Sequence, residues 1–264
     1  MNGVAMIELN GHSTWVHSGK GKKKPPVVLL HGGMSSSASL LRTLGPRLES
    51  HFRITAFDRR GHGKTPDTPA PFHYEDMADE VTSFLEFLGE PAHLVGHSDG
   101  GVVALLVARR RPALLRRVVA AGANYHFEGL RPMEEFSLDG PDFVRWAQDY
   151  GARSPDGVEH ARTVVEKALR LFATEPALRP ADLAVIDVPV LVLTGDDDVA
   201  HLTHTVAMYE AIPQAQLAIV PGTSHALFKE RPSASARIVR HFLAGQGPPI
   251  TLMPLRRSGR AVVT

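Results

Sequence analysis

Apolar and amphipathic segments alternate along most of the chain. Short, continuously apolar runs are typical of parallel strands that are buried on both faces, and helical periodicity marks the segments between them. Strands are predicted at residues 27–30, 52–57, 92–95, 117–121, 188–193 and 216–220. Helices are predicted at residues 36–48, 75–88, 102–108, 202–212 and 232–243. This alternation predicts an α/β fold with a mostly parallel, twisted sheet that is covered by helices on both faces.

One long segment in the middle of the chain breaks this alternation. Residues 124–184 contain no clear strand and carry more than their share of the aromatic residues. Helical segments are predicted within it at residues 141–150 and 157–171. We therefore interpret residues 1–123 and 185–245 as an α/β core, and residues 124–184 as a helical lid that is inserted over the strand ends.

The two ends of the chain differ from this core. Residues 6–9 and 14–16 flank the turn Asn10-Gly11, which predicts a β-hairpin before the first parallel strand. Residues 246–264 are rich in proline and glycine and then basic, so we interpret them as a C-terminal tail on the surface. The N-terminus lacks the basic and apolar regions of a signal peptide. No run approaches the roughly 20 apolar residues that a membrane span needs.

The composition narrows the kind of partner to expect. The 264 residues include 29 Lys and Arg and 28 Asp and Glu, which gives a formal net charge of +1. This balance offers no reason to expect a nucleic acid or an anionic membrane as partner. The chain has no cysteine, which excludes disulfides, cysteine-ligated zinc and thiol catalysis. We expect a cytoplasmic enzyme that acts on a small molecule.

The sequence Gly96-His97-Ser98-Asp99-Gly100 lies where a predicted strand turns into a predicted helix. A G-x-S-x-G pattern in this context is typical of a nucleophile elbow. The turn strains the serine backbone, and glycine on either side avoids clashes across it. The serine hydroxyl is expected to project into a cleft, with the following backbone N–H directed at the oxyanion that forms after attack. A glycine-rich turn that binds a phosphate, or nothing, is the alternative.

A serine hydroxyl needs a general base, and the chain contains 14 histidines. His225 is the best candidate because it follows the last predicted strand, and active sites of open parallel sheets form at the carboxyl ends of the strands. His97 adjoins Ser98 but is expected to point elsewhere, since neighbours in a sharp turn diverge. Supporting structural roles are expected for His31 and His62.

The base in turn needs a carboxylate that fixes its tautomer. Asp196, Asp197 and Asp198 directly follow a buried strand and offer three choices, although a polar turn explains this run equally well. A metal is suggested only weakly by His201 and His204, whose H-x-x-H spacing has no third ligand in view. We therefore expect no metal and no cofactor. Serine, acid and histidine follow one another in this order along the chain.

Residues 4–244 resemble the α/β-hydrolase superfamily. The matching motifs are the oxyanion loop His31-Gly32-Gly33, the D-x-R-G-x-G turn at residues 58–63 with Arg60 as the matching arginine, the elbow at residues 96–100, the acid turn Gly195-x-x-Asp198 and the histidine loop Gly222-x-x-His225. The resemblance implies an α/β-hydrolase fold with a helical lid insertion and a catalytic triad of Ser98, Asp198 and His225. It also implies an oxyanion hole formed by the N–H groups of Gly33 and Asp99.

Within the superfamily, the Ser-Asp-Gly-Gly elbow and the sequence Gly122-Ala123-Asn124 are similar to the serine hydrolases of the valacyclovir-hydrolase type. Dehalogenases and soluble epoxide hydrolases resemble the chain less, because their nucleophile is an aspartate where this sequence has Ser98. The resemblance implies a cofactor-free hydrolase that cleaves carboxylic esters or related acyl compounds through an acyl-enzyme. A perhydrolase or an acyltransferase would use the same residues, and a receptor that keeps the triad is a further alternative.

Substrate contacts are expected from the oxyanion loop and from the lid. Met34 is a candidate wall of that loop, and Phe127, Phe136 and Trp146 are the lid aromatics that we expect to line the acyl pocket. Packing inside the lid is the alternative for each aromatic. Asp99 either stabilises its helix through the helix dipole or faces the pocket and attracts an ammonium group. The resemblance favours the second role, since the valacyclovir-hydrolase type accepts aminoacyl esters.

Overall fold

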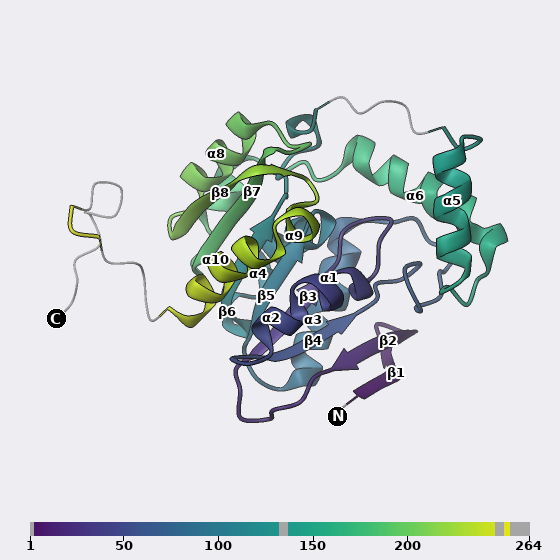
Figure 1. Ribbon diagram of the computed structural model, residues 1–264, viewed down its shortest axis with the longest axis horizontal. Helices are drawn as coiled ribbons and strands as arrows, with labels where there is room; N and C mark the ends of the chain where they lie inside the picture. Colours follow the sequence, from purple (N-terminus) through teal and green to yellow (C-terminus); the bar gives the residue numbers. More distant parts are fainter. Residues whose placement is uncertain (1–2, 132–136, 246–250, 254–264) are drawn as a thin grey trace.

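The computed structural model describes residues 3–131, 137–245 and 251–253. Its centre is an eight-stranded sheet with the strand order β1-β2-β4-β3-β5-β6-β7-β8 (Figure 1). Strands β3 to β8 are parallel, whereas β1 and β2 form an antiparallel hairpin whose second strand pairs antiparallel with β4. The predicted α/β class and the predicted hairpin are confirmed. The strands are β1 (Gly3–Leu9), β2 (His12–Ser18), β3 (Pro26–Leu30), β4 (Arg53–Phe57), β5 (Ala92–His97), β6 (Leu115–Ala121), β7 (Val190–Asp197) and β8 (Ala215–Ser224).

Alternate residues of the central strands enter two separate hydrophobic cores. In β3, Val28 and Leu30 belong to the first core, and Val27 and Leu29 belong to the second. Both faces of each strand are therefore apolar, which is why the strands appear in the sequence as unbroken apolar runs. The first core is covered mainly by α3 (Tyr74–Leu88), α4 (Asp99–Arg110) and α8 (Leu202–Ala211), and the second by α1 (Ser37–Thr43), α2 (Gly45–Leu48), α9 (Leu227–Glu230) and α10 (Pro232–Ala244).

The extent of two predicted helices is wrong. Residues 36–48 form the two short helices α1 and α2 rather than one. Pro46 lies in the first turn of α2, where its missing N–H is tolerated, but inside one continuous helix its ring would clash with the preceding turn. The helix predicted at residues 157–171 begins later, because Val158–His160 form a 3₁₀ turn that precedes α6 (Ala161–Thr174).

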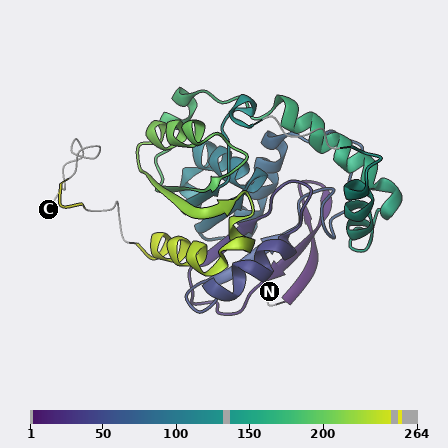
Figure 2. The same ribbon diagram turned by 45° about the horizontal axis from the view of Figure 1, so that its top comes forward.

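The segment at residues 124–184 is helical in its described part. It holds α5 (Pro141–Gly151), α6 and α7 (Pro180–Ala184), and its only β pairing there consists of isolated bridges. In both ribbon views α5 and α6 lie on the side of the molecule away from α10 (Figure 2). Movement of this segment as a lid stays a prediction. Apart from residues 251–253, the predicted C-terminal tail lies outside the described residues.

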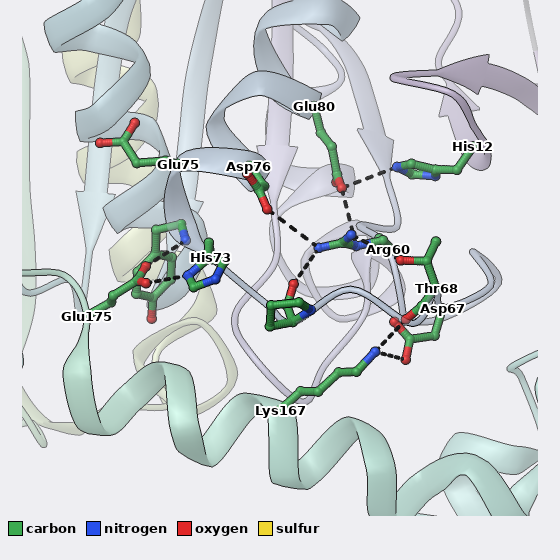
Figure 3. A network of polar contacts seen from close by, with 12 residues as sticks. His12, Arg60, Asp67, Thr68, His73, Glu75, Asp76, Glu80, Lys167 and Glu175 are labelled. Carbon is green, nitrogen blue, oxygen red and sulfur yellow. Dashed lines mark hydrogen bonds and ion pairs between the residues drawn. The ribbon is translucent and has the colours of Figure 1, made fainter.

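Polar contacts connect α6 to the core across long distances in the sequence (Figure 3). Lys167 Nζ lies 2.6 Å from Asp67 Oδ2. At the end of α6, Glu175 Oε2 accepts the backbone N–H of Tyr74 at 3.0 Å, and Glu175 Oε1 lies 2.6 Å from His73 Nδ1. Tyr74 is the first residue of α3. A carboxylate from the inserted segment therefore occupies the amino terminus of a core helix, where the helix dipole favours negative charge.

Among the helices of residues 3–131 and 137–245, none is both long and apolar enough to cross a bilayer.

Candidate active site

Ser98 lies in the sharp turn between β5 and α4. Its backbone has φ 55° and ψ −123°, a conformation that residues with a side chain rarely adopt. A Cβ added at Gly96 would lie 2.0 Å from the carbonyl oxygen of Gly100, and a Cβ added at Gly100 would lie 2.1 Å from the carbonyl oxygen of Leu30. Both positions therefore require glycine. The Ser98 N–H donates to the Ala121 carbonyl at 2.8 Å, which ties the turn to β6.

His225 and Asp198 meet at the carboxyl ends of two neighbouring parallel strands, β7 and β8. His225 Nδ1 lies 2.6 Å from Asp198 Oδ1. Burial opposes ionisation of Asp198, but hydrogen bonds from His225, Thr194 and the Val199 amide outweigh it and hold the pKa of Asp198 below its ordinary value. The ionised carboxylate can only accept, so the ring donates from Nδ1 and keeps Nε2 as its basic nitrogen.

The other two aspartates of the acid turn face elsewhere. Asp196 is exposed, and its Oδ1 accepts the Thr223 N–H at 3.1 Å. Asp197 is also exposed, at the end of β7, whereas Asp198 is only 4% exposed. The register of the turn therefore directs Asp198, and neither of its neighbours, to the His225 ring.

Ser98 and His225 line one cavity of about 350 Å³. Gly32, Gly33 and Met34 line the same cavity. A Cβ added at Gly32 would lie 3.1 Å from Ser98 Cβ, so the loop after β3 is in contact with the serine. The structure thus brings together the predicted nucleophile, the predicted base and the predicted oxyanion loop.

The inserted segment contacts this loop from two of its helices. The Trp146 indole N–H, from α5, donates to the Met34 carbonyl at 2.7 Å. Met34 has a φ of 51°, a left-handed conformation that is uncommon for a residue with a side chain. A Cβ added at Gly33 would lie 2.7 Å from the ring of Phe172, in α6. Trp146 and Phe172 therefore pack against the loop and support its shape.

The predicted substrate contacts are distributed over several places. Met34 lines the cavity that holds Ser98, whereas Trp146 lines an adjoining cavity of about 210 Å³. Phe127 does not line the cavity beside Ser98, and its ring lies 4.6 Å from that of His126. Phe136 lies outside the described residues.

Asp99 belongs to a buried polar cluster that no sequence motif indicated. Its carboxylate accepts the Tyr74 hydroxyl at 3.1 Å and lies 3.9 Å from the Arg59 guanidinium. Arg59 is 1% exposed and also donates to the His31 carbonyl at 2.7 Å. Burial raises the pKa of Asp99, although the Arg59 charge and the Tyr74 hydroxyl oppose this rise. A positive charge therefore already accompanies Asp99 inside the protein.

This pairing predicts the effect of Asp99→Asn. Arg59 stays charged at any ordinary pH, so it loses its nearest counter-charge, whereas removal of the buried carboxylate recovers part of a desolvation cost. We expect the free energy of unfolding to fall by about 1–3 kcal/mol, below the 3–5 kcal/mol typical of a broken buried pair. Urea unfolding measures this change, and Tyr74→Phe, which removes one hydrogen bond, is expected to cost about 1 kcal/mol.

The same variant tests whether Asp99 recognises an amine. Because Arg59 already compensates the carboxylate, we expect the rate ratio of an aminoacyl ester to its des-amino analogue to be the same in the wild type and in Asp99→Asn. The backbone N–H of residue 99 survives the substitution. A wild-type preference for the amine that disappears in Asp99→Asn would instead assign the carboxylate to substrate recognition.

Three further histidines surround the site in supporting positions. The His97 Nε2–H donates to the His225 carbonyl at 2.8 Å, and the two rings lie 4.9 Å apart. Burial, helped by the nearby His225, lowers the pKa of His97 to about 4, so this ring is neutral at pH 7. His31 Nε2 accepts the Arg59 N–H at 3.1 Å, and His62 Nδ1 lies 3.0 Å from the Arg60 carbonyl.

His204, the second histidine of the H-x-x-H pair, contacts Tyr125. His204 Nε2 accepts the Tyr125 N–H at 3.1 Å, and the two rings stack at 3.9 Å. Burial lowers the pKa of His204 to about 4, and nearby His126 and His201 add to this shift. Among the described residues, no group of three or more His, Asp or Glu side chains is arranged to hold a metal ion.

Comparisons with known proteins identify the family to which the chain belongs. The model of the alpha/beta hydrolase family matches residues 27–238. The putative carbamate hydrolase RutD of Agrobacterium fabrum is 28% identical over 233 residues, 79% of this chain and 89% of the relative. The serine hydrolase BPHL of Mus musculus is 25% identical over 263 residues, 90% of this chain and 86% of the relative. The crystal structure of the enol-lactonase from Burkholderia xenovorans superposes with a TM-score of 0.74 at 22% identity, covering 91% of this chain and 100% of that one. The chain therefore belongs to the alpha/beta hydrolase family and is a hydrolase.

Proposed function

We propose that this protein is a serine hydrolase that cleaves carboxylic esters or related acyl compounds through a Ser98-His225-Asp198 triad. The main observation in its support is the 2.6 Å contact between His225 Nδ1 and Oδ1 of the buried Asp198. His225 also lines the same cavity as Ser98, whose backbone is strained. The hydrogen bond to Asp198 leaves His225 Nε2 free to take a proton. A serine in an elbow conformation beside such a base has the environment that nucleophilic catalysis needs.

The proposed reaction follows from these positions. Ser98 Oγ attacks the substrate carbonyl carbon while its proton passes to His225, and the backbone N–H groups of Gly33 and Asp99 bind the resulting oxyanion. The bond to the leaving group then breaks, and the leaving group takes the proton from His225. Water then attacks the acyl-enzyme while His225 takes its proton, the bond between the acyl carbon and Ser98 Oγ breaks, and His225 returns the proton to Ser98 as the acid is released. One oxyanion donor is typically worth about 3 kcal/mol of the barrier.

The relatives support a broad range of acyl substrates. They are named as a putative carbamate hydrolase, a serine hydrolase and a 2-(acetamidomethylene)succinate hydrolase, and a structural neighbour is an enol-lactonase. We propose a small-molecule substrate and a cytoplasmic location. The assignment of Phe127, Phe136 and Trp146 to an acyl pocket, and a lid role for residues 124–184, stay predictions.

A substrate panel combined with active-site labelling tests the proposal. A fluorophosphonate is expected to label the wild type and to leave Ser98→Ala unlabelled, and the wild type is expected to hydrolyse members of a panel of short esters, amides and lactones. Labelling without turnover of any ester, amide or lactone would favour a receptor that keeps the triad. Faster transfer of the acyl group to peroxide or to an added alcohol than to water would favour a perhydrolase or an acyltransferase.

A further inference from the structure

Two cavities adjoin next to Ser98 and share part of their wall. The first, of about 350 Å³, holds Ser98 and His225, and the second, of about 210 Å³, lies between α1, α5 and α9. Both are lined by Met34, Ser35, Ser39 and Lys229. A ligand whose reacting group lies at Ser98 can therefore extend past Lys229 toward the second cavity.

Positive charge dominates the walls of these two cavities. Arg42, from α1, and Arg153, which follows α5, line the second cavity, and Lys229, from α9, lines both. Among the described residues that line them, Asp149 is the single carboxylate, and it lies 3.9 Å from Arg153. Within the part of the chain that the structure describes, no carboxylate lies within ion-pair distance of Arg42 or Lys229.

The carboxylate next to Lys229 in the sequence faces another group. Glu230 Oε2 accepts the Ser224 N–H at 2.7 Å, and Glu230 Oε1 accepts the Ser224 hydroxyl at 2.9 Å. Glu230 therefore does not neutralise Lys229 within the cavity. Ser35 and Ser39, which line both cavities, add hydroxyl groups that can donate hydrogen bonds. A pair of uncompensated cations with neighbouring hydroxyls is the chemistry that binds a carboxylate.

The position of Lys229 indicates which part of the substrate carries the negative charge. Lys229 lies in α9, which begins directly after His225 and Ala226. In the proposed reaction His225 delivers its proton to the leaving group, so the leaving group lies on the His225 side of Ser98. The aromatic side chains of α5 and α6, which include the predicted acyl-pocket residue Trp146, do not line this first cavity.

From these observations we propose that the Lys229 and Arg42 side of the site binds a leaving group that carries a carboxylate. This assignment rests on the proposed function, since it places an ester or amide carbonyl at Ser98. The substrate class is therefore an acyl derivative of a hydroxy acid or an amino acid, in which the hydroxyl or the amine is acylated and the carboxylate is free. Hydrolysis releases the free hydroxy acid or amino acid.

A matched pair of esters tests the charge preference. The probes are para-acetoxybenzoate, which has an anionic leaving group, and para-acetoxybenzamide, which has a neutral one of nearly the same shape. We expect the wild type to favour the benzoate in kcat/KM by about tenfold, mainly through KM, and we expect added sodium chloride to reduce this ratio, because exposed charges are screened by salt. Lys229→Gln is expected to remove most of the preference, and Arg42→Gln part of it.

The control variant is Lys20→Gln, which removes an exposed lysine in the loop between β2 and β3, where it lines a different cavity. It is expected to keep the wild-type ratio. Equal ratios in the wild type and in Lys229→Gln would overturn the inference while both esters are still cleaved, so the proposed function would stand. Failure to cleave either ester, or the panel compounds, would overturn the function itself.

A second pair of esters tests whether the site recognises a carboxylate on the leaving group or on the acyl part of the substrate. Phenyl hydrogen adipate carries its carboxylate on the acyl part, and phenyl hexanoate is its neutral analogue. We expect Lys229→Gln to change the rate ratio of this pair less than twofold, since exposed charges at a distance interact weakly. A change confined to this pair would place the charge on the acyl side and overturn the assignment of the leaving group.

Discussion

Ser98→Ala and His225→Ala are each expected to lower kcat/KM for a short phenyl ester by up to about 10⁶-fold. Removal of the hydroxyl removes the bond-forming atom, and removal of the imidazole leaves the hydroxyl without a base. Because the two side chains act as a unit, the double variant should be little slower than either single variant. Steady-state kinetics with phenol release, followed by absorbance, measure all three rates.

The fold of these variants is expected to persist. Ser98 and His225 are partly exposed in a cavity, and neither side chain belongs to either hydrophobic core. Circular dichroism and thermal unfolding should therefore show changes no larger than those of Ser83→Ala, a serine on α3 that is remote from the site. A folded Ser98→Ala protein that retains near-wild-type turnover would remove Ser98 from the mechanism.

Asp198→Asn is expected to lower kcat by about 10⁴-fold. An asparagine amide presented to His225 Nδ1 favours the tautomer that carries its hydrogen on Nε2, and this tautomer cannot accept the serine proton. The wild-type carboxylate, held ionised by His225, Thr194 and the Val199 amide, enforces the opposite tautomer. Kinetics on the same ester, with the folded state checked by circular dichroism, measure the effect.

Asp196→Asn and Asp197→Asn are the matched controls in the same turn. Both side chains are exposed, and neither contacts His225, so we expect each to change kcat by less than about threefold, as for surface substitutions away from a site. If Asp196→Asn lost its activity while Asp198→Asn kept it, Asp196 rather than Asp198 would be the carboxylate that supports the base.

The parts of the fold that could be predicted are those that leave a local pattern. The central strands are visible because both faces enter a core, as in β3, and the elbow is visible because Gly96 and Gly100 are sterically required. The division of residues 36–48, which the predicted single helix missed, also has a local signal in Pro46. In each of these cases the cause and the sequence signal lie within a few residues of each other.

The contacts around the elbow leave no such pattern. Arg59 reaches Asp99 because the loops after β4 and β5 meet at the same sheet edge, and Trp146 reaches Met34 across 112 positions of the sequence. These partners are set by tertiary packing, so neither the charge of Asp99 nor the aromatic character of Trp146 revealed its role. Arg60, the arginine of the recognised motif, instead donates to Thr68 and to the Pro71 carbonyl.

The carboxylate of Glu175 connects the inserted segment to the turn that holds Ser98. Glu175 ends α6 and accepts the N–H of Tyr74, and the Tyr74 hydroxyl donates to Asp99, the residue after Ser98. A displacement of α6 would withdraw the anion from the first turn of α3 and pull on the side chain that holds Asp99. Such a displacement would therefore reach the residue after Ser98 through two consecutive hydrogen bonds.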